Sequence, residues 1–171
     1  MHETRADLDA LQALLDGSYD GAGEHLRNIT TPERRLDAAK VSERLVGMTL
    51  LVLATVTADG RPLAGPVDGV FYRGSFYFGS SPDSVRFRHI RKRPWVSATH
   101  LPREELAVTV HGRAVPIDVK DASLRAFRQY LLDIYVPRYG DTWELFLDSG
   151  PQYARIDADR MFTFEWLDLP R

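Results

Sequence analysis

Two short turn signals separate three stretches of strand-forming residues between positions 49 and 78. Asp59-Gly60 follows the apolar run 49–57, and Arg73-Gly74 lies between the aromatic segments 70–72 and 76–78. A polar residue followed by glycine favours a β-hairpin, because glycine adopts the positive φ angle that a tight turn requires. We therefore expect a sheet that folds back on itself twice.

The run 49–57 is apolar on both of its alternating faces. Leu50, Val52 and Ala54 lie on one face, and Leu51 and Leu53 lie on the other. A strand of this kind is covered on both sides. If the sheet closes into a small barrel, one face fills the interior, and a helix, a partner chain or a flat ligand must cover the other.

Glycine and proline interrupt the next strand pattern, in the sequence Gly65-Pro66-Val67-Asp68-Gly69. Proline within a strand indicates an edge or a bulge, and glycine indicates that another group comes close to the backbone. Asp68 lies within this segment, where its carboxylate is placed to accept a hydrogen bond from a ring N–H of a bound ligand. The alternative interpretation is a hydrogen-bonded aspartate on the surface.

Helical periodicity, capping residues and alternating patterns predict the remaining elements. The predicted helices cover residues 5–17, 32–47, 85–93 and 118–137, with a linker at 18–23 and a short turn after Thr142. The further strands cover residues 95–99, 106–115, 153–156 and 161–166, the last two forming a hairpin around a turn at 157–159. The sum is an α+β fold, mainly β, in which a small antiparallel barrel is decorated by helices. We divide this single compact unit into a helical extension (1–47) that packs on the barrel and the barrel domain itself (48–171).

Composition excludes several classes of function. The 171 residues carry a formal net charge of −2, which gives no overall electrostatic case for binding nucleic acid or an anionic membrane. The chain has no cysteine, so a disulfide framework, a thiolate zinc site and a cysteine nucleophile are excluded. The first residues lack the apolar core of a secretory signal, and the longest apolar run, 50–54, is too short to span a bilayer. We expect a cytoplasmic protein.

The loop 79–84 and the helix that follows it combine hydroxyl groups with positive charge. Ser80, Ser81 and Ser84 precede Arg86, and the backbone N–H groups at the start of the helix add further donors. A phosphomonoester is bound by several directed donors together with a cation, so this segment is a candidate phosphate site. The alternative is a serine-rich turn followed by a solvated basic helix.

Other residue patterns do not indicate a specific site. The basic run 86–93 does not point to nucleic acid, because its charges spread around the helix and no exposed aromatic residues alternate with them to stack on bases. The histidines have no paired metal-ligand spacing, and His111 lies in a strand pattern typical of a packed or hydrogen-bonded residue. No pair of carboxylates suggests acid–base catalysis, and the motifs of hydrolases, P-loop NTPases and dinucleotide-binding proteins are absent. The sequence therefore identifies neither a metal site nor a catalytic residue.

Several short motifs between residues 45 and 119 occur in a recognisable order. They are Ala54-Thr55-Val56, Asp59-Gly60-Arg61-Pro62, Pro66-Val67, Ser84-x-Arg86, Arg93-Pro94-x-Val96-Ser97 and Gly112-Arg113-Ala114. In this order the segment resembles the pyridoxamine 5'-phosphate oxidase-like family of flavin-binding split β-barrels. The resemblance implies a split antiparallel barrel and a homodimer with FMN at the subunit interface. Some relatives in this family bind a deazaflavin coenzyme or haem instead.

The resemblance also implies which residues bind the cofactor. The phosphate-binding Ser-x-Lys of the family resembles Ser84-Val85-Arg86, and an earlier hydroxyl position falls on Ser80, directly after Gly79. The segment that lies along the flavin ring and ribityl chain falls on residues 65–70. Arg88 is a candidate to replace a lost charge. The expected cofactor-binding residues are Val67, Asp68, Gly69, Gly79, Ser80, Ser84, Arg86 and Arg88.

The chain departs from the true oxidases at several family positions. Gly65 and Val70 stand where those enzymes have an arginine and a lysine, Ala107 stands at a glutamine position, and no C-terminal tryptophan and arginine motif is recognisable in 153–171. The resemblance therefore implies an FMN-dependent oxidoreductase that acts on an unidentified small substrate other than pyridoxamine phosphate. Two alternatives remain: a reductase dependent on the deazaflavin F-420, and a non-catalytic dimeric module that binds flavin or haem.

Overall fold

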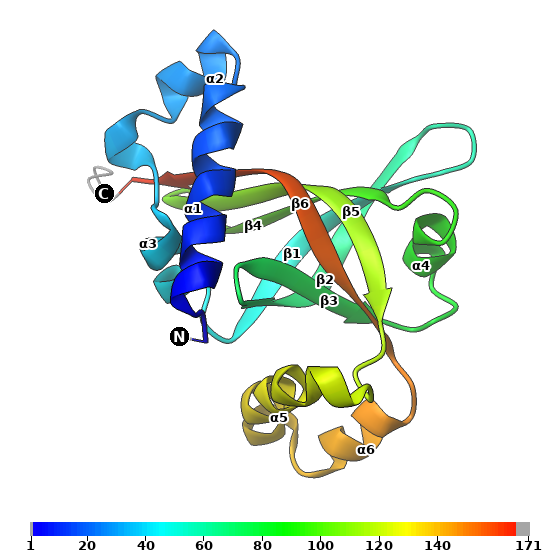
Figure 1. The fold of residues 1–171 in the computed structure, drawn as a ribbon. Coiled ribbons are helices and arrows are strands. Elements are labelled where there is room, and N and C mark those ends of the chain that lie inside the picture. The colour runs from blue at the N-terminus through cyan, green and yellow to red at the C-terminus, as the bar shows by residue number, and fades with distance from the viewer. Residues whose placement is uncertain (1, 167–171) are drawn as a thin grey trace.

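The computed structural model describes residues 2–166, and its centre is a closed six-stranded antiparallel barrel (Figure 1). The order of the strands around the barrel is β1-β2-β3-β6-β5-β4. Their bounds are β1 (Met48–Val56), β2 (Pro62–Tyr72), β3 (Ser75–Ser80), β4 (Trp95–Arg103), β5 (Leu106–Ile117) and β6 (Gln152–Glu165). This architecture confirms the predicted antiparallel barrel with helices.

The helices lie in three groups around the barrel (Figure 1). The first group is α1 (Arg5–Asp20), α2 (Glu24–Ile29), the 3-10 helix η1 (Pro32–Arg34) and α3 (Ala38–Arg44). The short helix α4 (Val85–Ile90) lies by itself between β3 and β4 in the chain. The third group, between β5 and β6, is the 3-10 helix η2 (Ala122–Leu124), α5 (Arg125–Tyr139) and α6 (Thr142–Asp148). Within the described part of the chain, no helix is both long and apolar enough to cross a membrane.

The two predicted hairpins are present. Gly60 has a φ of +86° at the turn between β1 and β2, and the Thr57 N–H donates to the Arg61 carbonyl at 2.9 Å to close that turn. Arg73 and Gly74 both have positive φ angles, +48° and +77°, between β2 and β3. Two consecutive positive φ angles match the twist of the flanking strands, which is why this turn joins adjacent strands directly.

The predicted helix over 32–47 is wrong. The chain forms η1, becomes extended at Arg35, and starts the new helix α3 at Asp37, whose side chain accepts a hydrogen bond from the Lys40 N–H at 2.8 Å. The interruption carries Leu36 into the core, where its N–H donates to the Thr163 hydroxyl at 2.9 Å. A contact with a residue of β6 thus overrides local helical preference.

The predicted linker at 18–23 is also partly helical, because α1 continues to Asp20 and α2 begins at Glu24. Tyr19 is buried, and its hydroxyl accepts a hydrogen bond from the Thr163 N–H of β6 at 2.8 Å. The Ser18 hydroxyl accepts from the Met161 N–H of the same strand at 2.9 Å. The end of α1 is therefore fixed by bonds to β6 that the local sequence does not reveal.

The predicted final hairpin is wrong, because residues 152–165 form the single long strand β6. Both halves of β6 pair with β5, and the register shifts between His111 and Gly112, opposite Ala158 and Arg160. A Cβ atom at Gly112 would lie 2.1 Å from the Asp157 carbonyl oxygen, so only glycine permits this close approach. The turn-like sequence at 157–159 therefore forms a bulge rather than a turn.

Two apolar clusters stabilise the fold. The first fills the barrel and includes buried residues of α1, α3 and α4, with Phe76, Phe78 and Phe87 fully buried. The second lies under α5 and α6, where Val70 of β2 packs with Phe127 and other residues of that helix pair. The second cluster fixes α5 and α6 against the strands that precede and follow them, and this packing positions the candidate site.

Candidate functional site

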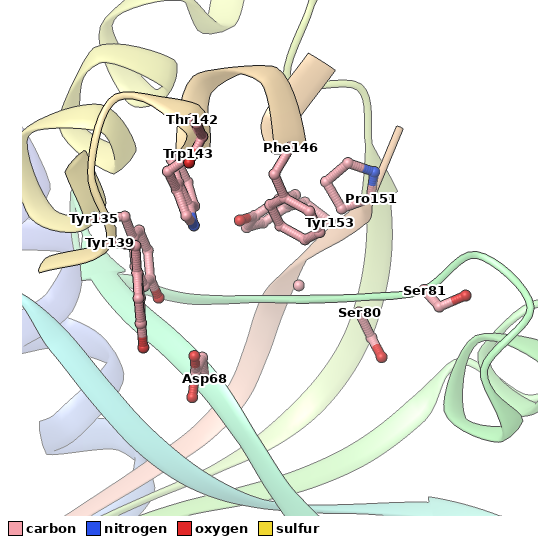
Figure 2. A pocket seen from close by; sticks show the side chains of 11 residues that line it. Asp68, Ser80, Ser81, Tyr135, Tyr139, Thr142, Trp143, Phe146, Pro151 and Tyr153 are labelled. Atoms are coloured by element: carbon pink, nitrogen blue, oxygen red, sulfur yellow. The ribbon is translucent and has the colours of Figure 1, made fainter. Parts of the chain in front are cut away.

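A cavity of about 460 Å3 lies between the helix pair α5–α6 and strands β2, β3 and β6 (Figure 2). Its volume falls within the range of small-molecule sites in proteins. The residues that line it are Asp68, Gly79, Ser80, Ser81, Tyr135, Tyr139, Thr142, Trp143, Phe146, Pro151 and Tyr153. We call this space the aromatic cavity.

Aromatic rings from the two helices form one side of the aromatic cavity (Figure 2). Tyr135 and Tyr139 are four residues apart on α5, and Trp143 and Phe146 are three apart on α6, so each pair shares a helix face. The rings of Tyr135 and Trp143 stack with centroids 4.5 Å apart and planes inclined by 14°. The ring of Tyr139 is stacked 6.1 Å from that of Tyr135. The result is a continuous wall of aromatic surface built from two short helices.

The opposite side of the cavity depends on a contact between β3 and β6. The ring of Tyr153 lies against the backbone of Gly79, where a Cβ atom would be 2.8 Å from the ring. A residue larger than glycine would therefore displace the Tyr153 ring. Gly79 is explained by this packing, and its neighbour Ser80 also lines the cavity.

The charge of the cavity comes from Asp68, the one charged side chain among its described lining residues. Across residues 2–166, the Asp68 carboxylate has no hydrogen bond or ion pair. Burial raises the pKa of Tyr153 to about 12, and the negative charge of Asp68 adds to the shift. Burial also raises the pKa of Tyr135, with Tyr153 and then Asp68 contributing. Both phenols are therefore neutral at physiological pH and remain hydrogen-bond donors.

The other predicted phosphate-binding groups lie outside the aromatic cavity. The Ser84 hydroxyl accepts a hydrogen bond from the Phe87 N–H at 3.3 Å and so caps α4. Arg88 donates from Nη1 to the Asp83 carbonyl at 2.5 Å. Arg86 donates from Nη2 to the Pro66 carbonyl at 2.9 Å, and burial lowers its pKa. The structure thus brings Asp68, Gly79 and Ser80 together in the aromatic cavity. By contrast, Ser84 and Arg88 are bonded within their own loop and helix, and Arg86 is bonded to β2.

Val67 and Gly69 face away from this cavity, toward the barrel interior. Val67 is buried in the core that fills the barrel. A Cβ atom at Gly69 would lie 2.6 Å from the Leu51 Cδ1 atom, so this glycine makes room for a core leucine. Val70 lies on the opposite face of β2 and is buried with residues of α5. It stands where the family resemblance places a lysine.

The outer face of β1 is apolar and exposed. Leu50 and Val52 are 56% and 52% exposed, and they pair in register with Asp68 and Pro66 of β2. The inner face, with Leu51 and Leu53, is buried, as expected for a strand that fills a barrel from one side. Met48, at the start of the same face, packs against the cluster under α5 and α6, whereas Leu50 and Val52 stay exposed in the described part of the chain.

The aromatic residues of α5 and α6 were not identified as site residues from the sequence. Tyr135 is buried on α5, and its side chain also lines the cavity. The density of aromatic residues between 135 and 153, at helical spacing, is the signal that points to the cavity. Among the described residues, no group of three or more His, Cys, Asp or Glu side chains is arranged to hold a metal ion.

Solved structures share this fold at low sequence identity. A conserved hypothetical protein of Mycobacterium tuberculosis, Rv2991, matches with a TM-score of 0.65 and 18% identity, over 82% of this chain and 92% of its own. A FAD-binding protein of Mesorhizobium loti matches with a TM-score of 0.58 and 19% identity, over 76% and 93%. The heme storage protein HutZ of Vibrio cholerae matches with a TM-score of 0.55 and 16% identity, over 74% and 91%. At these identities the likeness concerns the fold alone.

The sequence itself gives the assignment to a family. No curated protein matches the chain. The family described as Pyridoxamine 5'-phosphate oxidase matches residues 38–163, from the start of α3 to a point two residues before the end of β6. This range includes every strand of the barrel, the segment 65–70 and the loop before α4. The chain therefore belongs to the pyridoxamine 5'-phosphate oxidase family.

Proposed function

We propose that this protein is a homodimeric, FMN-dependent oxidoreductase that acts on a small substrate other than pyridoxamine phosphate. Membership of the family supports the proposal, and so does the fold shared with a FAD-binding protein. The observation that carries it is the exposed apolar face of β1 beside the segment 65–69 of β2, whose edge toward β3 is unpaired before Gly69 within the described residues. A flat ring system needs such a surface, and a second chain can cover what the ring leaves exposed.

The described residues fit the ring of a flavin on this face. Leu50 and Val52 supply an apolar surface, and the paired residues Pro66 and Asp68 supply the adjacent strand. The Asp68 carboxylate is free to accept a hydrogen bond from a ring N–H. β2 pairs with β1 in an unbroken register through Pro66, but it pairs with β3 only from Gly69 onward. Proline at position 66 has no N–H to donate, so this segment of β2 can lie along a ligand.

The phosphate end of the cofactor would depend on Arg86. Its Nη2 atom donates a hydrogen bond to the Pro66 carbonyl oxygen, and a Cβ atom added at Gly65 would be 3.9 Å from that nitrogen. A guanidinium carries five N–H donors, so one bond to a carbonyl leaves donors for phosphate oxygens. The hydroxyl of Ser80, at the end of β3, is a second candidate group. A buried valine, Val70, stands where the family has a lysine, so Arg86 is the more important cation at this end.

A bound flavin would supply the electron-transfer chemistry of the reaction. The protein would hold the ring between the outer face of β1 and the partner chain, and would limit the access of water to it. Leu50 and Val52 would fix the plane of the ring, and Arg86 would fix its phosphate tail. A substrate that enters beside Asp68 would meet the ring at the open end of the aromatic cavity.

Titration of the purified protein with FMN and with riboflavin tests the proposal. We expect FMN to bind at micromolar concentrations, with a change in its absorption spectrum, and riboflavin to bind less tightly because it lacks the phosphate. Oligomeric mass should correspond to a dimer. Failure to bind either flavin, in a protein that is folded by circular dichroism, would contradict the proposal, and binding of F-420 alone would replace FMN by the deazaflavin.

A haem-binding module without catalytic activity is the second candidate, and His100 favours it. Its Nδ1 lies 2.9 Å from the Leu50 carbonyl oxygen, which can only accept, so Nδ1 carries the proton and Nε2 keeps its lone pair. An imidazole fixed in this way, beside an exposed apolar face, is suited to bind iron. The related fold of a heme storage protein agrees with this alternative.

Haem titration separates the two candidates. If the module reading holds, haem gives a Soret band that is lost in His100→Ala and retained in His25→Ala, a substitution on the exposed side of α2. If the oxidoreductase proposal holds, bound FMN is reduced by NAD(P)H or by reduced deazaflavin. Bound FMN that neither donor reduces would favour a non-catalytic flavin module.

A further inference from the structure

A second cavity, of about 430 Å3, lies between α4 and the turn that joins β1 to β2. The residues that line it are Ala58, Arg88, His89, Arg91, Lys92 and Arg93. We call this space the basic cavity. Figure 1 shows α4 on the same side of the barrel as the tip of the β1–β2 hairpin and apart from the helix pair α5–α6. The basic cavity and the aromatic cavity share no lining residue.

The described lining of the basic cavity carries four cations and no acid. Within residues 2–166, none of the four forms an ion pair. The acid next to Ala58 in the turn, Asp59, is already paired with Arg61 at 2.8 Å. Asp83, whose carbonyl accepts a hydrogen bond from Arg88, does not line the cavity. The C-terminal end of α4 adds a partial negative charge of at most about half an elementary charge. Positive charge therefore dominates the cavity.

Hydrogen bonds to the protein hold three of the basic side chains in place. Arg93 donates from Nε to a backbone carbonyl of β1 at 2.9 Å, and Arg91 donates from Nη1 to the Pro82 carbonyl at 3.0 Å. The Nδ1 atom of His89 lies 2.9 Å from the hydroxyl of Thr55, a buried residue of β1. A guanidinium carries five N–H donors, so one bond to a carbonyl leaves donors for a ligand. Because these side chains are already positioned, a ligand that binds them loses less affinity to the ordering of side chains.

The kind of anion follows from the groups that line the cavity. A guanidinium binds phosphate oxygens in pairs, and an ammonium group adds a point charge. A single phosphate would neutralise only part of the charge of four cations, whereas linked phosphates carry more negative charge in a compact chain. Among the described lining residues there is no phenyl, phenol or indole ring, so the cavity has no surface that would select a base or another flat body.

We propose that the basic cavity binds a chain of two or three linked phosphate groups, such as the polyphosphate part of a nucleotide. The guanidinium groups of Arg91 and Arg93 bind the phosphate oxygens, and the exposed Lys92 closes over the chain from the solvent side. This site is additional to the proposed flavin site and does not depend on it.

Calorimetric titration of the full chain with inorganic triphosphate tests the proposal. We expect saturable binding at micromolar concentrations, about tenfold tighter than that of orthophosphate, because several cations act together on linked groups. Citrate is the matched control, since it carries several negative charges on carboxylates, and it should bind about tenfold more weakly than triphosphate. Equal affinities for citrate and triphosphate would overturn the proposal and indicate only general attraction of anions. Absence of saturable binding would also overturn it.

Two charge reversals assign the binding to the basic cavity. Lys92→Glu places a carboxylate in the cavity at an exposed position, and should weaken triphosphate about tenfold or more. Arg5→Glu makes the same change of charge on the exposed first turn of α1, and should leave the affinity unchanged. Equal losses in the two variants would show that the net charge of the protein, and not the cavity, attracts the anion, which would overturn the proposal.

Competition with flavins separates the basic cavity from the proposed flavin site. Arg88 is the one residue common to this cavity and to the cofactor-binding residues expected from the family resemblance. We expect FMN and triphosphate to bind at the same time. Displacement of triphosphate by FMN but not by riboflavin would place the flavin phosphate in the basic cavity and overturn the proposal. Triphosphate binding in a protein that takes up no flavin would support it and contradict the proposed oxidoreductase.

Three further probes identify what carries the phosphates. Binding of ATP with the affinity of inorganic triphosphate would support a soluble ligand. Co-sedimentation with vesicles that contain phosphatidylinositol bisphosphate, reversed by triphosphate, would support the same phosphate site and identify a lipid headgroup as its ligand. Tighter binding of a short DNA duplex than of triphosphate would overturn the proposal in favour of a nucleic-acid surface.

Discussion

The ring of Tyr153 lies so close to the backbone of Gly79 that a Cβ atom there would be 2.8 Å from two ring carbons. This contact joins β3 to β6 and forms part of the lining of the aromatic cavity. Because the Tyr153 ring is buried in the apolar cluster under α5 and α6, it has little room to move, and this contact restricts position 79 to glycine.

Substitution of Gly79 by alanine should destabilise the protein. The added methyl group must displace the Tyr153 ring, and overpacking of this kind costs about 1–3 kcal/mol. Denaturant unfolding followed by circular dichroism measures the change. Gly17→Ala is the matched control: position 17 lies in α1 with nothing within 4 Å of the new Cβ, so alanine should stabilise the protein by about 0.5–1 kcal/mol. Equal effects of the two substitutions would contradict the packing argument.

Removal of the guanidinium at position 86 should weaken FMN selectively. Arg86→Ala is expected to reduce FMN affinity about tenfold or more while leaving riboflavin affinity nearly unchanged, since only FMN carries the phosphate. Fluorescence titration with both flavins measures the difference. Arg91→Ala, in which an exposed arginine bonded to the Pro82 carbonyl is removed, should affect neither flavin. Equal losses for FMN and riboflavin in Arg86→Ala would place the phosphate elsewhere.

A charge on the outer face of β1 should separate the proposed dimer. Leu50→Asp introduces a carboxylate at a position that is exposed in the single chain, so folding should be retained while burial against a partner becomes unfavourable. Size-exclusion chromatography with light scattering should show a monomer, with loss of FMN binding. Leu145→Asp, on the exposed surface of α6, should remain dimeric. A dimeric Leu50→Asp variant would place the interface on another surface.

The titration of Tyr153 should respond to Asp68. Burial and the Asp68 charge raise the Tyr153 pKa from 10.0 to about 12, so the folded protein keeps this proton over a range in which the unfolded chain loses it. The contribution of Tyr153 to stability is therefore complete below pH 10 and is lost as the pH rises toward 12. Absorbance at alkaline pH measures phenolate formation. Asp68→Asn should lower the pKa of Tyr153, whereas Asp133→Asn, on the exposed side of α5, should not.

The parts of the fold that could be predicted from the sequence are those specified locally. Thr4 caps α1 through a reciprocal pair of hydrogen bonds with Asp7, and Arg73-Gly74 forms its hairpin with two positive φ angles. In both cases the residues that determine the structure are within a few positions of one another. The alternation of Leu50 and Leu51 likewise predicted one inner and one outer face of β1.

The remaining features depend on contacts between distant parts of the chain. The bulge in β6 forms because Gly112 of β5 allows the Asp157 carbonyl to approach, and no residue near 157 indicates this. The break before α3 forms because Leu36 is bonded to Thr163. The aromatic cavity brings residue 68 next to residues 135–153, so its lining could not be assembled from local patterns.

The position of β6 in the barrel has a consequence for biosynthesis. Among residues 2–166, β6 is the last strand, yet it lies between β3 and β5, and the Tyr19 hydroxyl of α1 bonds to Thr163. A nascent polypeptide therefore cannot close its sheet until residue 165 has left the ribosome. Contacts at such long sequence separation slow folding. During translation the apolar face of α1 therefore lacks its contacts with β6. We infer that a chain terminated before β6 aggregates or is degraded and does not form a smaller functional protein.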